Sequence, residues 1–100
     1  MDMKLECKGE DLIIAVSGKL DTFRAMDLDD RLNDIPDDVK NIYFDFDGLY
    51  YIASAGLRVL FWAQEYAEEK GGISSIRNVS PEVIETLRIT GFQDFVSEIS

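Results

Sequence analysis

The chain has 100 residues, of which 46% are hydrophobic, so it can bury one compact core, and we expect a single domain over residues 1–100. Twenty acidic residues against ten basic ones give a formal net charge of −10. A surface of this charge repels phosphate backbones and anionic lipid, which argues against nucleic acid and membrane surfaces as partners.

The first residues predict two paired strands. Residues 3–8 alternate apolar and polar side chains, which indicates a half-exposed strand. Residues 12–16 form a continuous apolar run, which is typical of a strand covered on both faces. Turn-forming residues lie between the two segments, so we expect an antiparallel hairpin. Gly18 ends the second strand.

A helix follows, capped by Asp21 or Thr22 and ending at about Asn33. Residues 21–38 are the most acidic stretch of the chain, which suits a solvated helix face or a surface that steers a basic partner. The apolar side chains of the helix form a thin stripe that we expect to face the core: Phe23, Met26, Leu28 and Leu32.

The middle of the chain predicts a third strand over residues 39–46, with alternate apolar side chains on one face. Residues 49–53 form a largely apolar connection. A long helix then covers residues 54–70, with apolar positions at helical spacing and glutamates on its wet side. Gly71 ends this helix as a C′ glycine.

The last part predicts a short strand over residues 73–76 and a helix that Ser80 caps, Pro81 begins and Gly91 closes. Residues 95–99 form a terminal edge strand or a helical turn. The order β-β-α-β-α-β-α predicts an α/β fold, in which helices pack on a mixed, mainly parallel sheet of four to five strands.

The residue types restrict the chemistry. There is no histidine, so the usual general base and the commonest metal ligand are missing. The single cysteine, Cys7, alternates with apolar residues, which predicts burial in a strand rather than reactivity. One cysteine suits a reducing compartment, and the apolar runs are too short for a membrane span or a signal peptide. We therefore expect a cytoplasmic protein without a cofactor or metal.

Two junctions between strands and helices stand out, at residues 18–22 and 51–57. Binding sites of parallel-sheet proteins collect where strands end and helices begin. Ser54 lies at the start of the long helix, where free amides and the positive end of the helix dipole favour an anion. The small residues Ala55 and Gly56 leave those donors accessible. Ser54 is then either a plain N-cap or part of a shelf, by which we mean a flat surface of accessible backbone amides that can bind an anion or a partner.

The chain resembles anti-sigma factor antagonists of the STAS domain family (sulphate transporter and anti-sigma factor antagonist) over nearly all of its length. The strand that contains Asp45 and the segments at residues 18–21, 78–83 and 87–92 belong to the match. Its most specific part is the start of the long helix, Ile52-Ala53-Ser54-Ala55-Gly56-Leu57.

The resemblance implies that Ser54 occupies the position of the residue that an anti-sigma factor serine kinase phosphorylates and a serine phosphatase restores. It also implies that Asp21 is the acidic residue beside the acceptor. Ala53 departs from the family pattern, in which an acidic residue commonly stands, and Ala55 replaces a second hydroxyl residue. The expected partner-binding residues are Asp21, Thr22, Ala53, Ser54, Ala55, Gly56, Leu57 and Arg58.

These observations leave several functions to compare. The resemblance implies a switch in bacterial transcription regulation, which we expect to be a monomer or a weak dimer and not an enzyme. The alternative is a STAS-type binding module that docks a protein or a small ligand without phosphorylation. An enzyme would need Asp21, Asp45 and Asp47 to bind Mg²⁺ or to act in acid–base chemistry, whereas Asp21 suits a cap and Asp47 a turn.

Three aromatic side chains fit two interpretations. Tyr50, Tyr51 and Trp62 belong either to the core or to a docking surface beside Ser54, because tyrosine and tryptophan are common anchors of protein interfaces.

Overall fold

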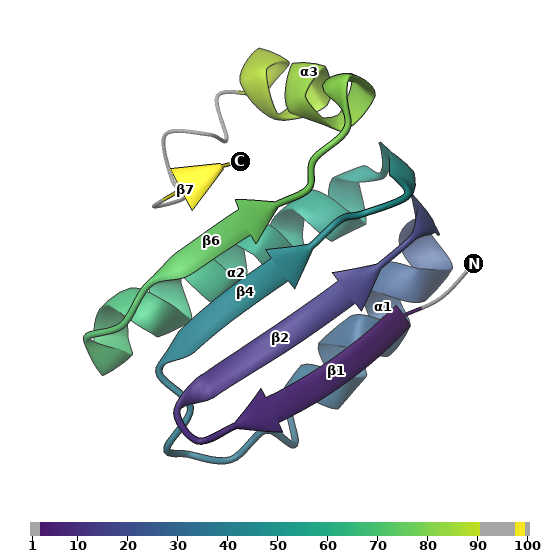
Figure 1. Cartoon of the computed structure of the whole chain (residues 1–100). Coiled ribbons are helices and arrows are strands. Elements are labelled where there is room, and N and C mark those ends of the chain that lie inside the picture. Colours follow the sequence, from purple (N-terminus) through teal and green to yellow (C-terminus); the bar gives the residue numbers. More distant parts are fainter. Residues whose placement is uncertain (1–2, 91–97, 100) are drawn as a thin grey trace.

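The computed structural model describes residues 3–90 and 98–99, which form a main sheet, a second small sheet and three helices (Figure 1). The strands of the main sheet, in spatial order, are β1 (Met3–Lys8), β2 (Asp11–Val16), β4 (Asn41–Asp45), β6 (Ser74–Arg77) and β7 (Glu98–Ile99). The small sheet consists of β3 (Gly18–Leu20) and β5 (Leu49–Ile52). The helices are α1 (Thr22–Leu32), α2 (Ser54–Lys70) and α3 (Pro81–Ile89).

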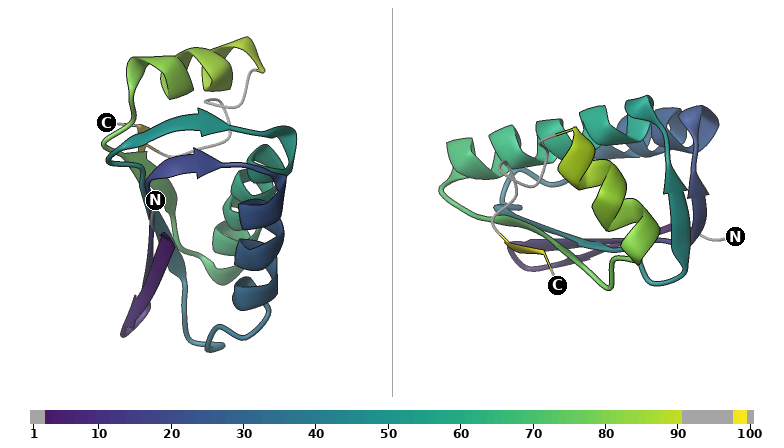
Figure 2. Two further views of the ribbon diagram at one scale, coloured as in Figure 1. Left: turned by 90° about the vertical axis from the view of Figure 1, so that its right-hand side faces the viewer. Right: turned by 90° about the horizontal axis from the view of Figure 1, so that it is seen from above.

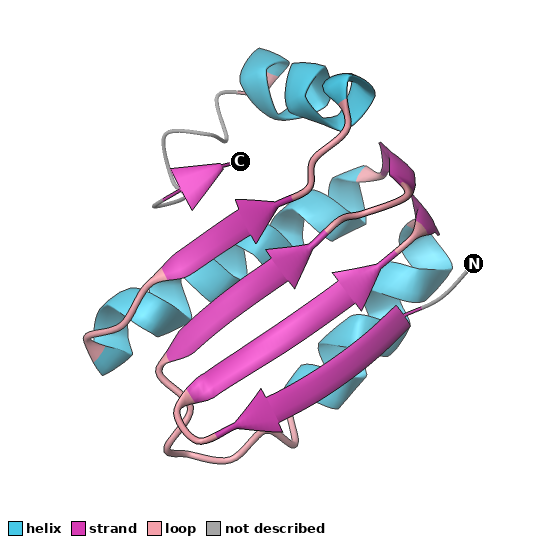
Figure 3. Ribbon diagram, viewed as in Figure 1, coloured by secondary structure: helices cyan, strands magenta, loops and turns pink. Residues whose placement is uncertain are grey.

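The predicted fold class is confirmed. β1 and β2 form the expected antiparallel hairpin, and every other neighbouring pair of the main sheet is parallel. Figure 3 shows the strands of the main sheet side by side, with helices packed beside them. A parallel pair needs a crossover, and α1 and α2 supply the crossovers from β2 to β4 and from β4 to β6. The sheet is therefore mixed, with five strands of which only β1 runs against the rest among the described residues.

The predicted burial of β2 on both faces is wrong. Leu12, Ile14 and Val16 are buried, whereas Ile13 and Ala15, which point to the other side, are only half-buried. Figure 2 shows the reason: α1 and α2 lie on the same side of the main sheet. The third helix, α3, packs against β5 instead of covering the second face. Two of the five residues of this continuous apolar run are thus not part of the buried core.

The chain pairs residues 18–20 with residues 49–52, a pairing that the sequence analysis missed. Gly18 begins β3 instead of ending β2, and the apolar connection is the strand β5. The two strands are parallel, with Leu20 opposite Ile52 and a register shift after Gly18. The Gly18 amide also donates to the Gly48 carbonyl at 2.9 Å.

The expected apolar stripe of α1 is half wrong. Leu28 and Leu32 are buried as predicted, but Phe23 and Met26 are 84% and 61% exposed. Ala25 is buried in their place, because α1 packs against α2 along a face that begins with this small residue. Two large apolar side chains therefore lie on the surface near the start of α1.

Cys7 is exposed, contrary to the prediction that it is buried. It lies on β1, the edge strand of the main sheet, opposite Leu12. The apolar side of β1 is only partly covered even at Met3 and Leu5, which are half-buried. An edge strand at the margin of the helical layer does not bury its whole apolar side.

The ends of the helices follow the expected capping chemistry. Asp21 is the N-cap of α1, and the Ser80 hydroxyl accepts a hydrogen bond from the Val83 amide at the start of α3. Gly71 ends α2 with a left-handed φ of 77°. The predicted closure by Gly91 lies outside the described residues, as do residues 95–97 of the last segment; β7 confirms a terminal edge strand at its end.

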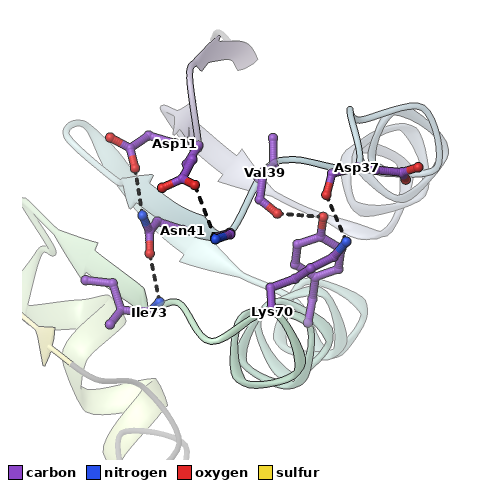
Figure 4. Close-up of polar contacts among 9 residues, drawn as sticks. Asp11, Asp37, Val39, Asn41, Lys70 and Ile73 are labelled. Carbon is purple, nitrogen blue, oxygen red and sulfur yellow. Dashed lines mark hydrogen bonds and ion pairs between the residues drawn. The ribbon is translucent and has the colours of Figure 1, made fainter.

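Asn41 joins three segments at the end of the sheet opposite the start of α2 (Figure 4). Its side-chain amide donates to Asp11 at 2.9 Å, and its side-chain carbonyl accepts from the Ile73 amide at 3.0 Å. The backbone amide of Asn41 donates to the Glu10 carbonyl at 3.0 Å. This network fixes the β1–β2 turn, the start of β4 and the approach to β6.

Tyr66 and Lys70 tie the last turns of α2 to the loop before β4. The Tyr66 hydroxyl donates to the Val39 carbonyl at 2.9 Å, and the Lys70 ammonium donates to the Asp37 carbonyl at 2.8 Å (Figure 4). Burial, followed by the negative charges of Asp37 and Asp38, raises the pKa of the Tyr66 phenol. The phenol therefore remains protonated as a donor over the neutral pH range.

No helix in the described part of the chain is long and apolar enough to span a membrane.

Gly71 and Gly72 are required for different reasons, and their substitution tests the packing at this end. A Cβ on Gly72 would lie 2.0 Å from the Lys40 carbonyl oxygen, whereas Gly71 has open space and only a positive φ. We expect Gly72→Ala to lower the free energy of unfolding by about 3 kcal/mol through overpacking. Gly71→Ala should cost about 1 kcal/mol through backbone strain. Urea unfolding measures both, and equal losses would contradict the predicted clash.

Candidate functional site

Ser54 is the first residue of α2 and is exposed. The N-cap of this helix is Ala53, which has extended backbone angles (φ −85°, ψ 167°) and no side-chain cap. The interpretation of Ser54 as a plain N-cap is therefore wrong. The hydroxyl lies one position inside the helix, at the end where the dipole is positive.

The pairing of β3 with β5 brings the starts of α1 and α2 together. The two helices follow directly after these parallel strands, so their first residues lie at the same edge of the small sheet (Figure 1). The Ala53 amide continues the pairing by donating to the Leu20 carbonyl at 2.9 Å. Leu20, the residue before Asp21, therefore lies beside Ala53, so the segments that contain Asp21 and Ser54 meet although these two residues are 33 positions apart in the sequence.

Asp21 has a structural task at this junction. Its backbone is extended, and its carboxylate accepts a hydrogen bond from the Arg24 amide at 3.0 Å. The Arg24 guanidinium donates in turn to the carbonyls of Ser17 and Lys19, at 2.8 and 3.3 Å. These bonds fasten the start of α1 to the strand before it, and Thr22 is exposed at the first helical position.

The expected shelf of open amides is smaller than predicted. The amides of Gly56 and Leu57 both donate to the Ala53 carbonyl, at 2.9 and 3.1 Å, so they are not free for a ligand. Gly56 is buried, and a Cβ there would lie 2.8 Å from Ile52. Glycine is required here for close packing of α2 on the small sheet and not for access by a partner.

An open groove of about 190 Å³ lies between α1 and α2, next to Ser54. Two of its residues, Ala55 and Arg58, belong to the predicted partner-binding set, whereas the contribution of α1 was not predicted. The groove is lined by Ala25, Met26, Asp29, Ala55, Arg58 and Val59.

The aromatic side chains divide between surface and core. Tyr50 and Tyr51 on β5 are 54% and 49% exposed, close in the chain to Ser54. Trp62 is half-buried and stacks on Tyr66 with ring centres 5.0 Å apart. Together with the exposed Phe23, the two tyrosines give the region around the helix starts large apolar groups of the kind that anchor protein interfaces.

The three aspartates considered for an enzyme do not share one role. Asp45 accepts hydrogen bonds from the Asp47 amide and the Asn78 side chain, at 3.1 and 2.9 Å, and so shapes the turn after β4. Asp21 caps α1. Within residues 3–90 and 98–99, no group of three or more acidic or cysteine side chains is arranged to hold a metal ion.

The sequence matches the family model of the STAS domain over residues 2–100. No curated protein sequence matches the chain. Solved structures resemble it closely in fold: the anti-sigma factor antagonist SpoIIAA in its unphosphorylated form has a TM-score of 0.82 at 19% identity, covering 99% of this chain and 89% of that one. The phosphorylated form of SpoIIAA from Bacillus has a TM-score of 0.77, also at 19% identity, covering 99% and 92%.

Two other solved structures are similar. An anti-sigma factor antagonist from Mycobacterium paratuberculosis has a TM-score of 0.80 at 18% identity, covering 98% of this chain and 84% of that one. A sulfate transporter family protein from Wolinella succinogenes has a TM-score of 0.74 at 22% identity, covering 87% and 74%. At these identities the likeness shows a common fold.

Gly56→Ala tests how the junction is held. In an open helical position this change would raise stability by about 1 kcal/mol, because alanine is the better helix former. Contact of the new methyl group with Ile52 and Leu20 reverses the sign, and we expect a loss of about 1–3 kcal/mol. Urea unfolding measures the change, and faster hydrogen exchange at the start of α2 should accompany it. A stabilised variant would contradict the packing described here.

Proposed function

The chain belongs to the STAS domain family, and we propose that it is an anti-sigma factor antagonist, a single domain whose binding to a protein partner is switched by phosphorylation of Ser54. The partner is a cytoplasmic anti-sigma factor that is also a serine kinase, and a serine phosphatase reverses the modification. The observation that carries the proposal is the exposed Ser54 at the start of α2, directly after Ala53, whose amide is bonded to the Leu20 carbonyl before the start of α1. SpoIIAA, which shares the fold, exists in an unphosphorylated and a phosphorylated form.

The unmodified surface suits a protein better than a small substrate. Met26 is exposed and lines the groove, Phe23 is exposed about one turn earlier on α1, and Tyr51 is exposed on the strand that leads to Ser54. Large apolar side chains gathered near one junction are typical of protein interaction sites. In this role the chain is a binding partner and a kinase substrate, and it needs no catalytic group of its own.

Phosphorylation moves the γ-phosphoryl group of ATP to the Ser54 oxygen, while ADP leaves and the hydroxyl proton is released. The phosphate adds about −1.5 to −2 charges at neutral pH. The positive end of the α2 dipole partly stabilises that charge. Ser54 lies outside the core, so the fold remains as it is.

The same group disrupts binding because it adds bulk and charge at the centre of the proposed interface. A partner that fits closely around a small neutral hydroxyl must either desolvate the phosphate or move away. Misplaced charge in an interface costs several kcal/mol, and about 2.7 kcal/mol already weakens binding a hundredfold.

A second candidate is a STAS module that binds a protein or a small ligand without phosphorylation. Ala53 favours this alternative, because family members that are phosphorylated commonly have an acidic residue there. The likeness to a sulfate transporter family protein is consistent with it. The groove of about 190 Å³ beside Arg58 has room only for a small ligand.

Incubation with ATP and the anti-sigma factor serine kinases of the same organism separates the two candidates. We expect intact-mass spectrometry to show one added phosphate on the wild-type chain and none on Ser54→Ala. Ser80→Ala is the control, because its hydroxyl caps α3 and the variant should be modified normally. A phosphate on Ser54→Ala would place the acceptor elsewhere, and no phosphate on any variant would favour the unregulated module.

Replacing exposed apolar side chains tests where the partner binds. Phe23→Ser should weaken binding of the kinase at least tenfold, because it removes a large exposed ring about one turn from Met26, which lines the groove. Ile89→Ser on α3 is the matched control, since Ile89 is 76% exposed but lies away from the α1–α2 groove. Isothermal titration calorimetry measures both affinities. Equal losses, or a loss only in Ile89→Ser, would contradict the proposed surface.

A further inference from the structure

We propose that Arg58 binds the phosphate of phosphorylated Ser54. Through this contact the modification also changes the charge of the groove between α1 and α2. This inference rests on the proposed phosphorylation of Ser54. It assigns Arg58 a positioning role: the residue orients the phosphate and changes the surface that a partner meets.

The spacing of the two residues supports the pair. Ser54 and Arg58 are both exposed on α2 and are four positions apart. Residues at this spacing lie on the same face of a helix, with Cβ atoms roughly 5–6 Å apart. A negative group that precedes a positive one by four residues is the favourable orientation, because it also suits the helix dipole. The guanidinium can bind a phosphate through two parallel hydrogen bonds.

The side chain of Arg58 is also available to bind a phosphate. Within residues 3–90 and 98–99, no hydrogen bond, ion pair or ring contact of its side chain is found. The other four arginines are engaged inside the chain: Arg24 with two backbone carbonyls, Arg31 and Arg88 with carboxylates about one turn away, and Arg77 with the ring of Tyr43. An arginine without a structural task, one turn from the proposed acceptor, can respond to a new charge without breaking an existing contact.

The groove explains how this response would reach a partner. Arg58 and Asp29 line it from opposite helices, and both are exposed. No ion pair joins them among the described residues. The positive charge of Arg58 therefore acts on Asp29 only as a longer-range electrostatic interaction across the groove. A phosphate of about −1.5 to −2 charges attracts the guanidinium more strongly than one carboxylate does. When Arg58 turns towards Ser54, the groove loses its cation and Asp29 is left uncompensated.

Lys19 is the competing phosphate partner, because it is exposed on β3 opposite Tyr51 in the small sheet. Arg24 is not available as a second competitor, because its guanidinium already donates to the carbonyls of Ser17 and Lys19. A lysine on the neighbouring strand is a point charge on a flexible stem and lacks the two-pronged geometry of arginine. Arg58 is therefore the better partner, and the two can be separated experimentally.

The test uses full-length protein with phosphoserine incorporated genetically at position 54, so it does not depend on any kinase. A ³¹P NMR titration measures the second pKa of the phosphate. A nearby cation favours the dianion and lowers this pKa below its usual value of about 6. We expect Arg58→Gln to raise the pKa by about half a unit, and Arg58→Lys to give an intermediate value. Arg31→Gln removes the same charge at the far end of α1 and should leave the pKa unchanged.

A second readout follows the groove. The side-chain carboxyl ¹³C signal of Asp29 should move on phosphorylation of the wild-type chain and stay in place in Arg58→Gln. The proposal is overturned if Arg58→Gln leaves the phosphate pKa unchanged, or if Lys19→Gln alone raises it. Since the phosphoserine is incorporated without a kinase, these results are separate from the proposed function, which fails only if kinases do not modify Ser54 or modification does not affect binding.

Discussion

The pairing of β3 with β5 is the constraint on which the candidate site depends. Two short parallel strands fix where α1 and α2 begin, and the bond from the Ala53 amide to the Leu20 carbonyl extends that pairing to the first residues of the helices. Gly56 lets α2 pack closely against the same strands. Residues that are distant in the sequence thus share one surface, and a hydroxyl at the start of α2 lies within the area that a partner of α1 would cover.

The surface around Ser54 is separated from the contacts that hold the fold. α2 has 17 residues and is therefore about 25 Å long. Its far end is fixed by Tyr66 and Lys70, and Asn41 joins three segments at the same end of the sheet. Ser54 takes part in none of these hydrogen bonds, so a change at this residue does not break them. This separation allows a modification to alter binding while stability is maintained elsewhere.

Much of the fold could be predicted from the sequence, because long helices and the hairpin have clear periodicity and caps. The bounds of α2 were predicted as the structure has them, and the observed cap of α1, Asp21, is one of the two residues predicted for it. β3 and β5 were missed because three or four residues are too few to show an alternating pattern. The exposure of Phe23 was missed because apolar spacing alone does not tell which face of a helix meets the core. The groove involves side chains of two helices, so Asp29 gave no local signal.

The central claim is that phosphate on Ser54 weakens partner binding without unfolding the chain. The most direct test is a calorimetric titration of the anti-sigma factor kinase with two forms of the chain, one unmodified and one with phosphoserine at position 54. Thermal unfolding of both forms is measured alongside. The account predicts about a hundredfold weaker binding and nearly the same unfolding temperature. Equal affinities, or a loss of affinity that accompanies a large drop in unfolding temperature, would contradict it.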